Sequence, residues 1–230
     1  MELKGRLRLV ADMVPSCRIV SDVGTDHAYV PIFLIEREVC KKAIATDVRT
    51  GPIDKARKNI LQYKMEDCID TRIGDGLEPL EDDEIDIIII AGMGGLLIRN
   101  IISNSFEKAQ KAKRLILQPM NAIEVLREWL YKNGFNISDE GLAKEDGKIY
   151  NVLAAEWTGL SKHYEEVYYH IGKKLVEKRD PLLKEHLERK LRQIDKAING
   201  LNKAEKKDVE VISGKMKLKE EIEKILKNLE

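Results

Sequence analysis

Short apolar runs of this 230-residue sequence end in residues that could bind a small molecule. Asp22 and Gly24 end the first run, Asp47 ends the second, and Asp75 stands between two glycines after the third. A glycine lets the backbone approach a ligand closely. An acid about twenty residues beyond such a glycine can hold a ribose diol. An acid after the third run could accept a hydrogen bond from an exocyclic amine. These residue types predict a nucleotide cofactor.

The loop after the first run departs from the dinucleotide-binding fingerprint. That fingerprint, GxGxxG, seats a pyrophosphate on a helix N-terminus, but here Asp26 and Ala28 occupy the later glycine positions. Asp22 and Asp26 would repel a pyrophosphate and would favour a cation. S-adenosylmethionine carries a sulfonium, an amino group, a ribose diol and an adenine, so we predict this cofactor. The missing glycines disfavour an oxidoreductase.

The segments that must position these residues alternate between strand and helix patterns. The uninterrupted run Ile87–Ile90 predicts a strand buried on both faces of a parallel sheet, and the segments between the runs have helical spacing. The last two expected strands form a hairpin around Gly147. We therefore predict an α/β fold with a Rossmann-like, doubly wound sheet over residues 1–159, in which the strand carboxyl ends share one edge.

The remaining residues, 160–230, have a different pattern. Apolar residues recur at heptad spacing, at Leu187, Leu191, Ile194, Ile198 and Leu201 and again at Ile222, Ile225 and Leu229. Asn199–Gly200 and the charged run NKAEKKD predict a turn between two helices, and Asp180–Pro181 predicts a helix start. We predict a C-terminal α-helical coiled-coil domain. Its 18 Lys and Arg against 14 Asp and Glu suit RNA contact, or equally a solvated oligomerisation or docking element.

Composition sets limits on location and partners. The formal net charge is zero and no apolar run approaches the roughly 18 residues of a membrane span. Cys17, Cys40 and Cys68 lack CxxC spacing, so we expect reduced thiols rather than a disulfide or a zinc site. We expect a soluble, cytoplasmic protein with no metal and no membrane partner, present as a monomer or a weak homo-oligomer.

Three motifs resemble a known family. In this order, DVGTDHAYVPI, IIAGMGG and LQPM are similar to segments of the bacterial tRNA (adenine-22-N1)-methyltransferases, and the likeness runs from LKGRLRLVADMV through EDGKIYNVLAAEW. Val23 and Thr25 stand where related loops often have Ile and Ser, which are conservative changes. The resemblance implies a class I methyltransferase fold with a C-terminal coiled coil, S-adenosylmethionine as donor, and tRNA as acceptor. The nucleotide position rests on the resemblance alone.

The strand-end pattern and the resemblance together give the candidate site residues. For the cofactor they are Asp22, Gly24, Thr25, Asp47, Asp75, Gly76, Ala91, Gly92 and Met93. For catalysis, near the methyl group or the target base, they are Asp26, His27 and Tyr29. For the substrate they are Arg6, Arg8, Gly94, Gly95, Gln118, Pro119, Lys173, Lys174, Arg189 and Arg192.

The chemistry expected of these residues is methyl transfer to a ring nitrogen. Adenine N1 has an in-plane lone pair, so it needs positioning more than a strong base. Asp26 could stabilise the charge that develops, His27 could move a proton or contact the base or a phosphate, and Tyr29 could stack or hydrogen-bond. The segment Ala91–Gly95 has no side-chain acceptor for an exocyclic amine. Alternatives are that Asp26 and His27 only cap the next helix, that the acceptor is another RNA or a small molecule, or that the chain is a non-catalytic binding module.

Overall fold

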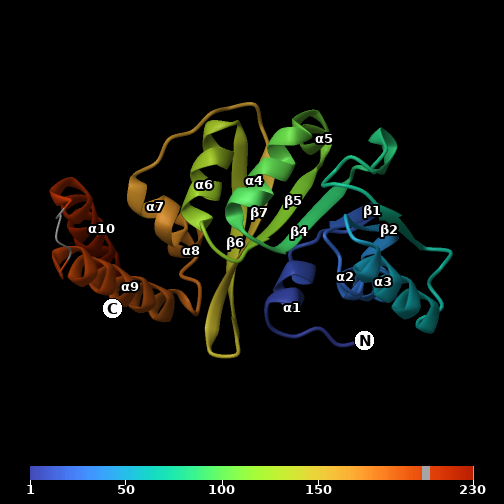
Figure 1. The fold of residues 1–230 in the computed structure, drawn as a ribbon, viewed down its shortest axis with the longest axis horizontal. Helices are drawn as coiled ribbons and strands as arrows, with labels where there is room; N and C mark the ends of the chain where they lie inside the picture. Colours follow the sequence, from blue (N-terminus) through green and yellow to red (C-terminus); the bar gives the residue numbers. More distant parts are fainter. Residues whose placement is uncertain (204–207, 230) are drawn as a thin grey trace. The chain divides into compact units, whose positions relative to one another are not determined.

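The computed structural model describes residues 1–203 and 208–229. One seven-stranded sheet with the order β3-β2-β1-β4-β5-β7-β6 forms the centre of the first part (Figure 1). Its parallel strands are β1 (Cys17–Val23), β2 (Cys40–Asp47), β3 (Ile69–Ile73), β4 (Ile87–Met93) and β5 (Arg114–Pro119). The antiparallel hairpin of β6 (Phe135–Glu145) and β7 (Lys148–Trp157) completes it. The predicted Rossmann-like sheet with a final hairpin is confirmed.

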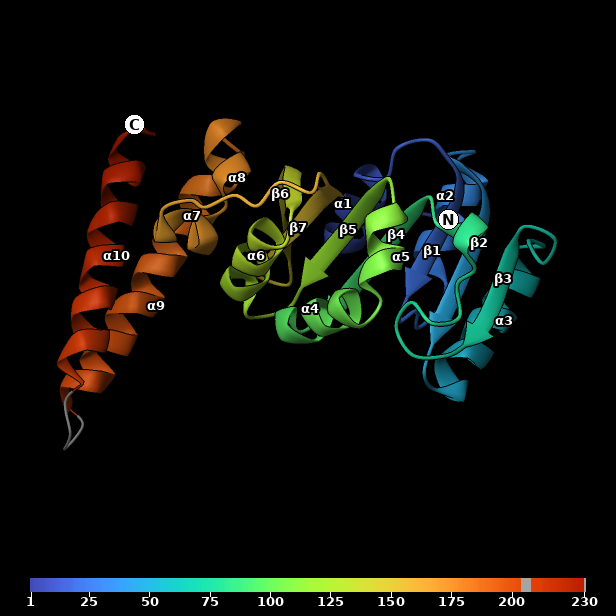
Figure 2. The same cartoon turned by 90° about the horizontal axis from the view of Figure 1, so that it is seen from above.

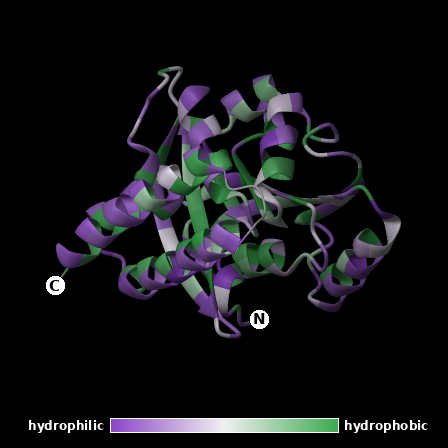
Figure 3. Cartoon of the chain, turned by 60° about the vertical axis from the view of Figure 1, so that its left-hand side comes forward, coloured by the Kyte–Doolittle hydropathy of each residue, from purple (hydrophilic) through white to green (hydrophobic). Residues whose placement is uncertain are grey.

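Helices cover both faces of this sheet, with α1 and α2 on one side and α4 and α6 on the other (Figure 2). Their bounds are α1 (Gly5–Asp12), α2 (Tyr29–Glu36), α3 (Thr50–Gln62), α4 (Gly95–Asn104), α5 (Phe106–Lys111) and α6 (Ile123–Lys132). A 3-10 turn, η1, spans Asp82–Glu84. Because both faces are covered, Ile87–Ile90 are at most 1% exposed. The central strands are accordingly hydrophobic (Figure 3).

Strand β1 lies between β2 and β4, and its register with both sets the site. Val23 pairs with Thr46 of β2 on one side and with Ile90 of β4 on the other. The residues that follow these three strands are therefore brought to one edge of the sheet. The strand order reverses between β1 and β4, and such a reversal opens a crevice at the carboxyl ends of the strands.

A buried ion pair anchors the hairpin to α6. The Arg127 guanidinium lies 2.7 Å from a Glu140 carboxylate oxygen, and both side chains are 1% exposed. Arg127 also donates to the Asn151 side chain over 3.1 Å. Removing one partner of such a pair would leave a buried charge and would cost on the order of 3–5 kcal/mol. The hairpin is thus fixed to α6 by this ion pair and to β5 by strand pairing.

The described chain divides into two compact units, Met1–His163 and Tyr164–Glu230. The second contains α7 (Glu166–Ile171), α8 (Lys173–Glu177), α9 (Leu183–Lys203) and α10 (Val209–Lys227). Helices α9 and α10 pack together, burying Leu187, Ile194, Leu218 and Ile222, and Lys219 of α10 pairs with Asp195 of α9 over 2.7 Å. The prediction of a helical C-terminal pair is confirmed.

The start and the end of α9 both differ from the positions predicted from the sequence. The predicted turn at Asn199–Gly200 is wrong, because α9 continues through both residues to Lys203. The apolar stripe on α9 outweighs the weak helix propensity of one Asn and one Gly. Part of the run NKAEKKD, residues 204–207, lies outside the described residues. Asp180 lies three residues before α9, which begins at Leu183, and its side chain accepts a hydrogen bond from the Leu182 amide.

The cysteine expectation is also wrong. Cys17 and Cys40 form a disulfide, and only Cys68 is free. The two cysteines are register partners at the starts of β1 and β2, with a Cα–Cα distance of 4.8 Å that suits a disulfide. Their separation of 23 residues in sequence gave no sign of this pairing. Within the described ranges, no helix is long and apolar enough to cross a membrane, and no cluster of His, Cys, Asp and Glu could hold a metal ion.

Candidate active site

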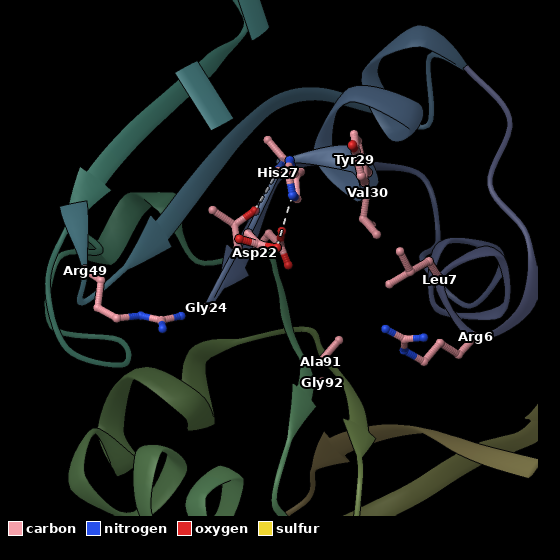
Figure 4. Close-up of a pocket in the computed structure, with 13 residues that line it drawn as sticks. Arg6, Leu7, Asp22, Gly24, His27, Tyr29, Val30, Arg49, Ala91 and Gly92 are labelled. Carbon is pink, nitrogen blue, oxygen red and sulfur yellow. Dashed lines mark hydrogen bonds and ion pairs between the residues drawn. The ribbon is translucent and has the colours of Figure 1, made fainter. Parts of the chain in front are cut away.

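A cavity of about 600 Å³ opens where β1 and β4 end (Figure 4). This volume lies in the range of small-molecule sites. Its lining comes from α1, the end of β1, the β1–α2 loop, the start of α2, the loop between β2 and α3, and the end of β4. The lining residues are Arg6, Leu7, Asp22, Gly24, Thr25, Asp26, His27, Ala28, Tyr29, Val30, Arg49, Ala91 and Gly92.

Gly24 turns the chain at the floor of this cavity. Its φ of +80° lies in the left-handed region, which favours glycine. The amides of Gly24 and Thr25 both donate to the Thr46 carbonyl, each over 2.8 Å, so the turn is tied to the end of β2. A Cβ on Gly24 would also displace the Met93 methyl group at the end of β4. Gly24 therefore lets the ends of three strands meet closely.

Asp22 is the buried acid of the cavity. It is 8% exposed, and this burial raises the pKa of its carboxyl from 3.8 to about 6, although a hydrogen bond from Thr25 opposes the shift. Thr25 also accepts a hydrogen bond from the Ala28 amide over 3.1 Å. Because burial disfavours the charged form of Asp22, a cation bound in the cavity would stabilise its carboxylate.

The three catalytic candidates lie together on the loop that leads into α2. A carboxylate oxygen of Asp26 is 3.2 Å from His27 Nε2, and the other is 3.1 Å from Lys55 Nζ of α3. The rings of His27 and Tyr29 stack in parallel, with centroids 4.9 Å apart. The loop turns through Ala28, whose φ of +54° is in the left-handed region.

Two side chains of helix α3 hold this loop in position. The Asn59 side-chain amide donates to the His27 carbonyl over 2.9 Å, and Lys55, one helical turn earlier, pairs with Asp26. Helix α2 begins with Ala28 as its N-cap residue. Because Asp26 and His27 bond to each other and to α3, their contacts do not favour the alternative that they serve as helix caps.

The acids after β2 and β3 lie outside the cavity lining. Asp47 is 7% exposed and accepts from the Arg49 amide over 2.8 Å, while the Arg49 side chain reaches the cavity. In the turn after β3, Asp75 is exposed and Gly76 is half-buried. The Gly74 amide donates to the Asp47 carbonyl over 3.1 Å, which links the two strand ends.

The glycine segment at the end of β4 is fixed by the end of β5 and the loop that follows it. Gly92, with a φ of +76°, donates its amide to the Gln118 side-chain oxygen over 3.1 Å. The Gly95 amide donates to the Asn121 carbonyl over 3.0 Å. Gln118 is fully buried, so it reaches the cavity through the Gly92 backbone. Met93, Gly94, Gly95 and Pro119 are likewise outside the lining.

The basic substrate candidates occupy different environments. Arg6 lines the cavity, whereas Arg8 pairs with Asp12 over 2.7 Å on the exposed side of α1. In the second unit, Lys173 and Lys174 pair with Glu177, and Arg189 pairs with Glu185 over 2.6 Å. Arg192 is exposed on α9.

Sequence reasoning missed six residues at this site. Leu7, Ala28, Val30 and Arg49 line the cavity, and Lys55 and Asn59 support its loop. The spacing of Lys55 and Asn59 was visible as one helical turn. Their contacts cross 29 and 32 residues of sequence, and no local pattern predicts such pairings.

Comparison with known proteins places this site in a family. Residues 3–153 match the methyltransferase domain family. The curated tRNA (adenine(22)-N(1))-methyltransferase of Bacillus subtilis is 40% identical over 156 residues, which cover 68% of this chain and 66% of that protein, just under two thirds of its length. The chain belongs to the tRNA (adenine(22)-N(1))-methyltransferase family. The predicted family resemblance is confirmed.

Solved structures of the family extend the likeness beyond the first unit. The crystal structure of the B. subtilis M1A22 tRNA methyltransferase TrmK has a TM-score of 0.83 and 32% identity, covering 99% of this chain and 98% of that one. A Streptococcus pneumoniae protein solved in complex with S-adenosyl-L-methionine has a TM-score of 0.84 and 33% identity, covering 96% and 98%.

Replacing Asp22 with asparagine should stabilise the protein above pH 6. As pH rises, the unfolded chain loses the Asp22 proton near 3.8 and the folded chain only near 6, so the free energy of unfolding falls between these values and stays lower above them. We expect Asp22→Asn to recover on the order of 1–3 kcal/mol above pH 6 and to match the wild type below 3.8. Denaturant unfolding across pH measures this, with exposed Asp12→Asn as the charge control. Equal stability of Asp22→Asn and wild type at every pH would contradict the burial cost.

Proposed function

We propose that the chain transfers a methyl group from S-adenosylmethionine to N1 of adenine 22 in tRNA. The observation that carries this proposal is the acid-lined cavity at the β1–β4 switch, in a chain 40% identical to an enzyme named for that reaction. The protein acts in the cytoplasm, where its tRNA substrate is found, as a monomer or weak homo-oligomer.

The residues of the cavity fit this cofactor. A buried carboxyl, Asp22, suits the ammonium or sulfonium charge, and the left-handed turn at Gly24 leaves backbone room beside it. Asp47, at the end of β2, would hold the ribose diol, and Asp75 and Gly76 would approach the adenine. Thr25, Ala91, Gly92 and Met93 would complete the contacts. When bound, S-adenosylmethionine supplies an electrophilic methyl group.

The Asp26 loop would serve the acceptor base. Asp26 keeps a side chain 60% exposed at the cavity, where its carboxylate would accept a hydrogen bond from the exocyclic amine and stabilise the positive charge developing on adenine. Lys55 and His27 hold that carboxylate in place. The target base has to leave its stack at a cost of a few kcal/mol, and the stacked His27–Tyr29 pair offers it a flat surface, since Tyr29 is 40% exposed.

The end of β4 and the two glycines that follow it would form the opposite wall for the base. Ala91–Gly95 places no side-chain acceptor there, which suits a ring nitrogen better than an exocyclic amine. Gly94, Gly95 and Pro119 would let the base lie close to the backbone. Gln118 would act as a positioning residue, because its buried side chain holds the Gly92 amide.

The helical tail would bind the tRNA backbone. Its proposed phosphate contacts are Lys173, Lys174, Arg189 and Arg192. The first three have glutamate partners, which a phosphate would have to replace. Arg192 is exposed, so it is the most direct place to test electrostatic binding.

Methylation of a tRNA transcript tests the reaction itself. We expect purified protein with labelled S-adenosylmethionine to place one methyl group at adenine 22 of an unmodified transcript, with N1-methyladenosine identified by nuclease digestion and mass spectrometry. A matched transcript with guanine at position 22 should remain unlabelled. Label elsewhere in the tRNA would overturn the position, and cofactor binding without RNA labelling would favour another acceptor.

Asp26→Asn should separate catalysis from cofactor binding. The amide keeps the shape of the side chain but lacks the negative charge, so we expect kcat to fall by roughly 10- to 1000-fold. The affinity for S-adenosylmethionine, measured by calorimetry, should change less than about twofold. Asp54→Asn, at an exposed position of α3, is the matched control. Unchanged kcat in Asp26→Asn would remove Asp26 from the mechanism.

Arg192→Gln should weaken tRNA binding through the loss of one phosphate contact. We expect affinity to fall by about 2- to 10-fold and the slope of log K against log salt to become smaller by about 0.7–0.9. Filter binding at several salt concentrations measures both. Gln193→Ala, a neutral neighbour on the same helix, should leave the slope unchanged. An Arg192→Gln slope equal to that of wild type would exclude this contact.

A further inference from the structure

We propose that Arg6, held by Glu145, binds the α-carboxylate of the cofactor's amino-acid group. This inference rests on the proposed function, because it assumes that S-adenosylmethionine occupies the cavity. It differs from the expectation that Arg6 contacts the tRNA substrate.

Contacts between the β6–β7 hairpin and α1 hold Arg6 in place. The Arg6 backbone amide donates to one Glu145 carboxylate oxygen over 2.9 Å, and its guanidinium pairs with the other. Gly5 makes this approach possible, since its φ is +54° and a Cβ there would collide with the Glu145 carboxylate. Glu145 therefore anchors the start of α1 and the guanidinium together.

Glu145 contacts only part of the Arg6 guanidinium. The guanidinium carbon lies 5.4 Å from the centre of the Tyr150 ring, so the group is also held over an aromatic face. Its Nε is enclosed and has no hydrogen-bond partner among the described residues. An enclosed donor without an acceptor is unfavourable. Glu145 accepts from Nη1 of the guanidinium, so an anion bound in the cavity would accept from another of its nitrogens.

The cavity has two ends, and Arg6 marks one of them. Arg6 and Leu7 lie on one side of Asp22 and Gly24, and Arg49 lies on the other (Figure 4). Arg49 is next to Asp47, to which its amide donates, and Asp47 is the acid placed for the ribose diol. With the ribose at the Asp47 end, the amino-acid group of the cofactor has to extend toward Arg6.

The charges at the Arg6 end match those of an amino acid. The cofactor carries an ammonium and a carboxylate on the same carbon, so its binding site needs an acid and a base close to one carbon atom. Asp22 supplies a buried acid and Arg6 the base, both on the wall of one cavity. A guanidinium fork matches the two oxygens of a carboxylate. A tRNA phosphate would not need the ammonium partner.

Arg8 does not share this arrangement. It lies on the exposed side of α1, with Asp12 as its ion-pair partner, and it is absent from the cavity lining. Arg6 is thus the arginine of α1 that faces the cofactor.

Calorimetry with two ligands tests the assignment without tRNA and without turnover. The ligands are S-adenosylmethionine and its decarboxylated form, which keeps the adenine, the ribose, the sulfonium and the amine. We expect wild type to prefer the carboxylated ligand by roughly 10- to 100-fold, as for a charge-assisted hydrogen bond. Arg6→Gln should reduce this preference to less than about threefold, and Arg6→Lys should retain part of it. Arg37→Gln, the same change at an exposed arginine, should keep the wild-type preference.

Each other outcome has a definite meaning. A wild type that binds both ligands equally would overturn the inference, and so would an Arg6→Gln protein that keeps the preference. If the preference disappears in Arg49→Gln instead, the carboxylate lies at the opposite end of the cavity. If Arg6→Gln keeps the preference but loses tRNA affinity, Arg6 is a phosphate contact. A wild type that binds neither ligand would reject the proposed function as well. Should Arg6→Gln fail to fold, a wild-type preference in Arg6→Lys would overturn the assignment.

Discussion

The pairing of β1 with both β2 and β4 is the constraint on which the rest of this structure depends. Parallel pairing on both sides aligns the three strands, so that whatever follows them has to meet at one edge. The Thr46 carbonyl of β2 holds the turn at Gly24, because it accepts hydrogen bonds from two amides of that loop. The cavity, the buried acid and the Asp26 loop all follow from this one alignment.

Several groups around that edge of the sheet are held in energetically unfavourable arrangements. Burial disfavours the charged form of Asp22, Ala28 adopts a left-handed backbone, and the buried Gln118 side chain bonds to the Gly92 amide and to the Pro119 carbonyl. Each holds a group of the cavity in place before any ligand arrives, so that binding does not have to order it.

Much of the fold could be predicted because its signals are local. The run Ile87–Ile90 predicted a central strand and the heptad pattern predicted the tail helices. Of the predicted strand-end acids, Asp22 lines the cavity, whereas Asp47 and Asp75 do not. The errors arose where distant contacts decide the structure. Cys17 and Cys40 meet only through strand register, and the site contacts of Lys55 and Asn59 are made across two elements. At Asn199–Gly200 the local turn signal was real, but the packed stripe of α9 overrode it.

The contact between Arg6 and Glu145 joins residues 139 positions apart in the sequence. The first helix is made early by the ribosome, while its partner belongs to one of the last strands of the sheet. A nascent chain that already contains every lining residue, up to Gly92, therefore still lacks the glutamate that holds Arg6. Completion of the hairpin is the step of synthesis that supplies the partner of Arg6.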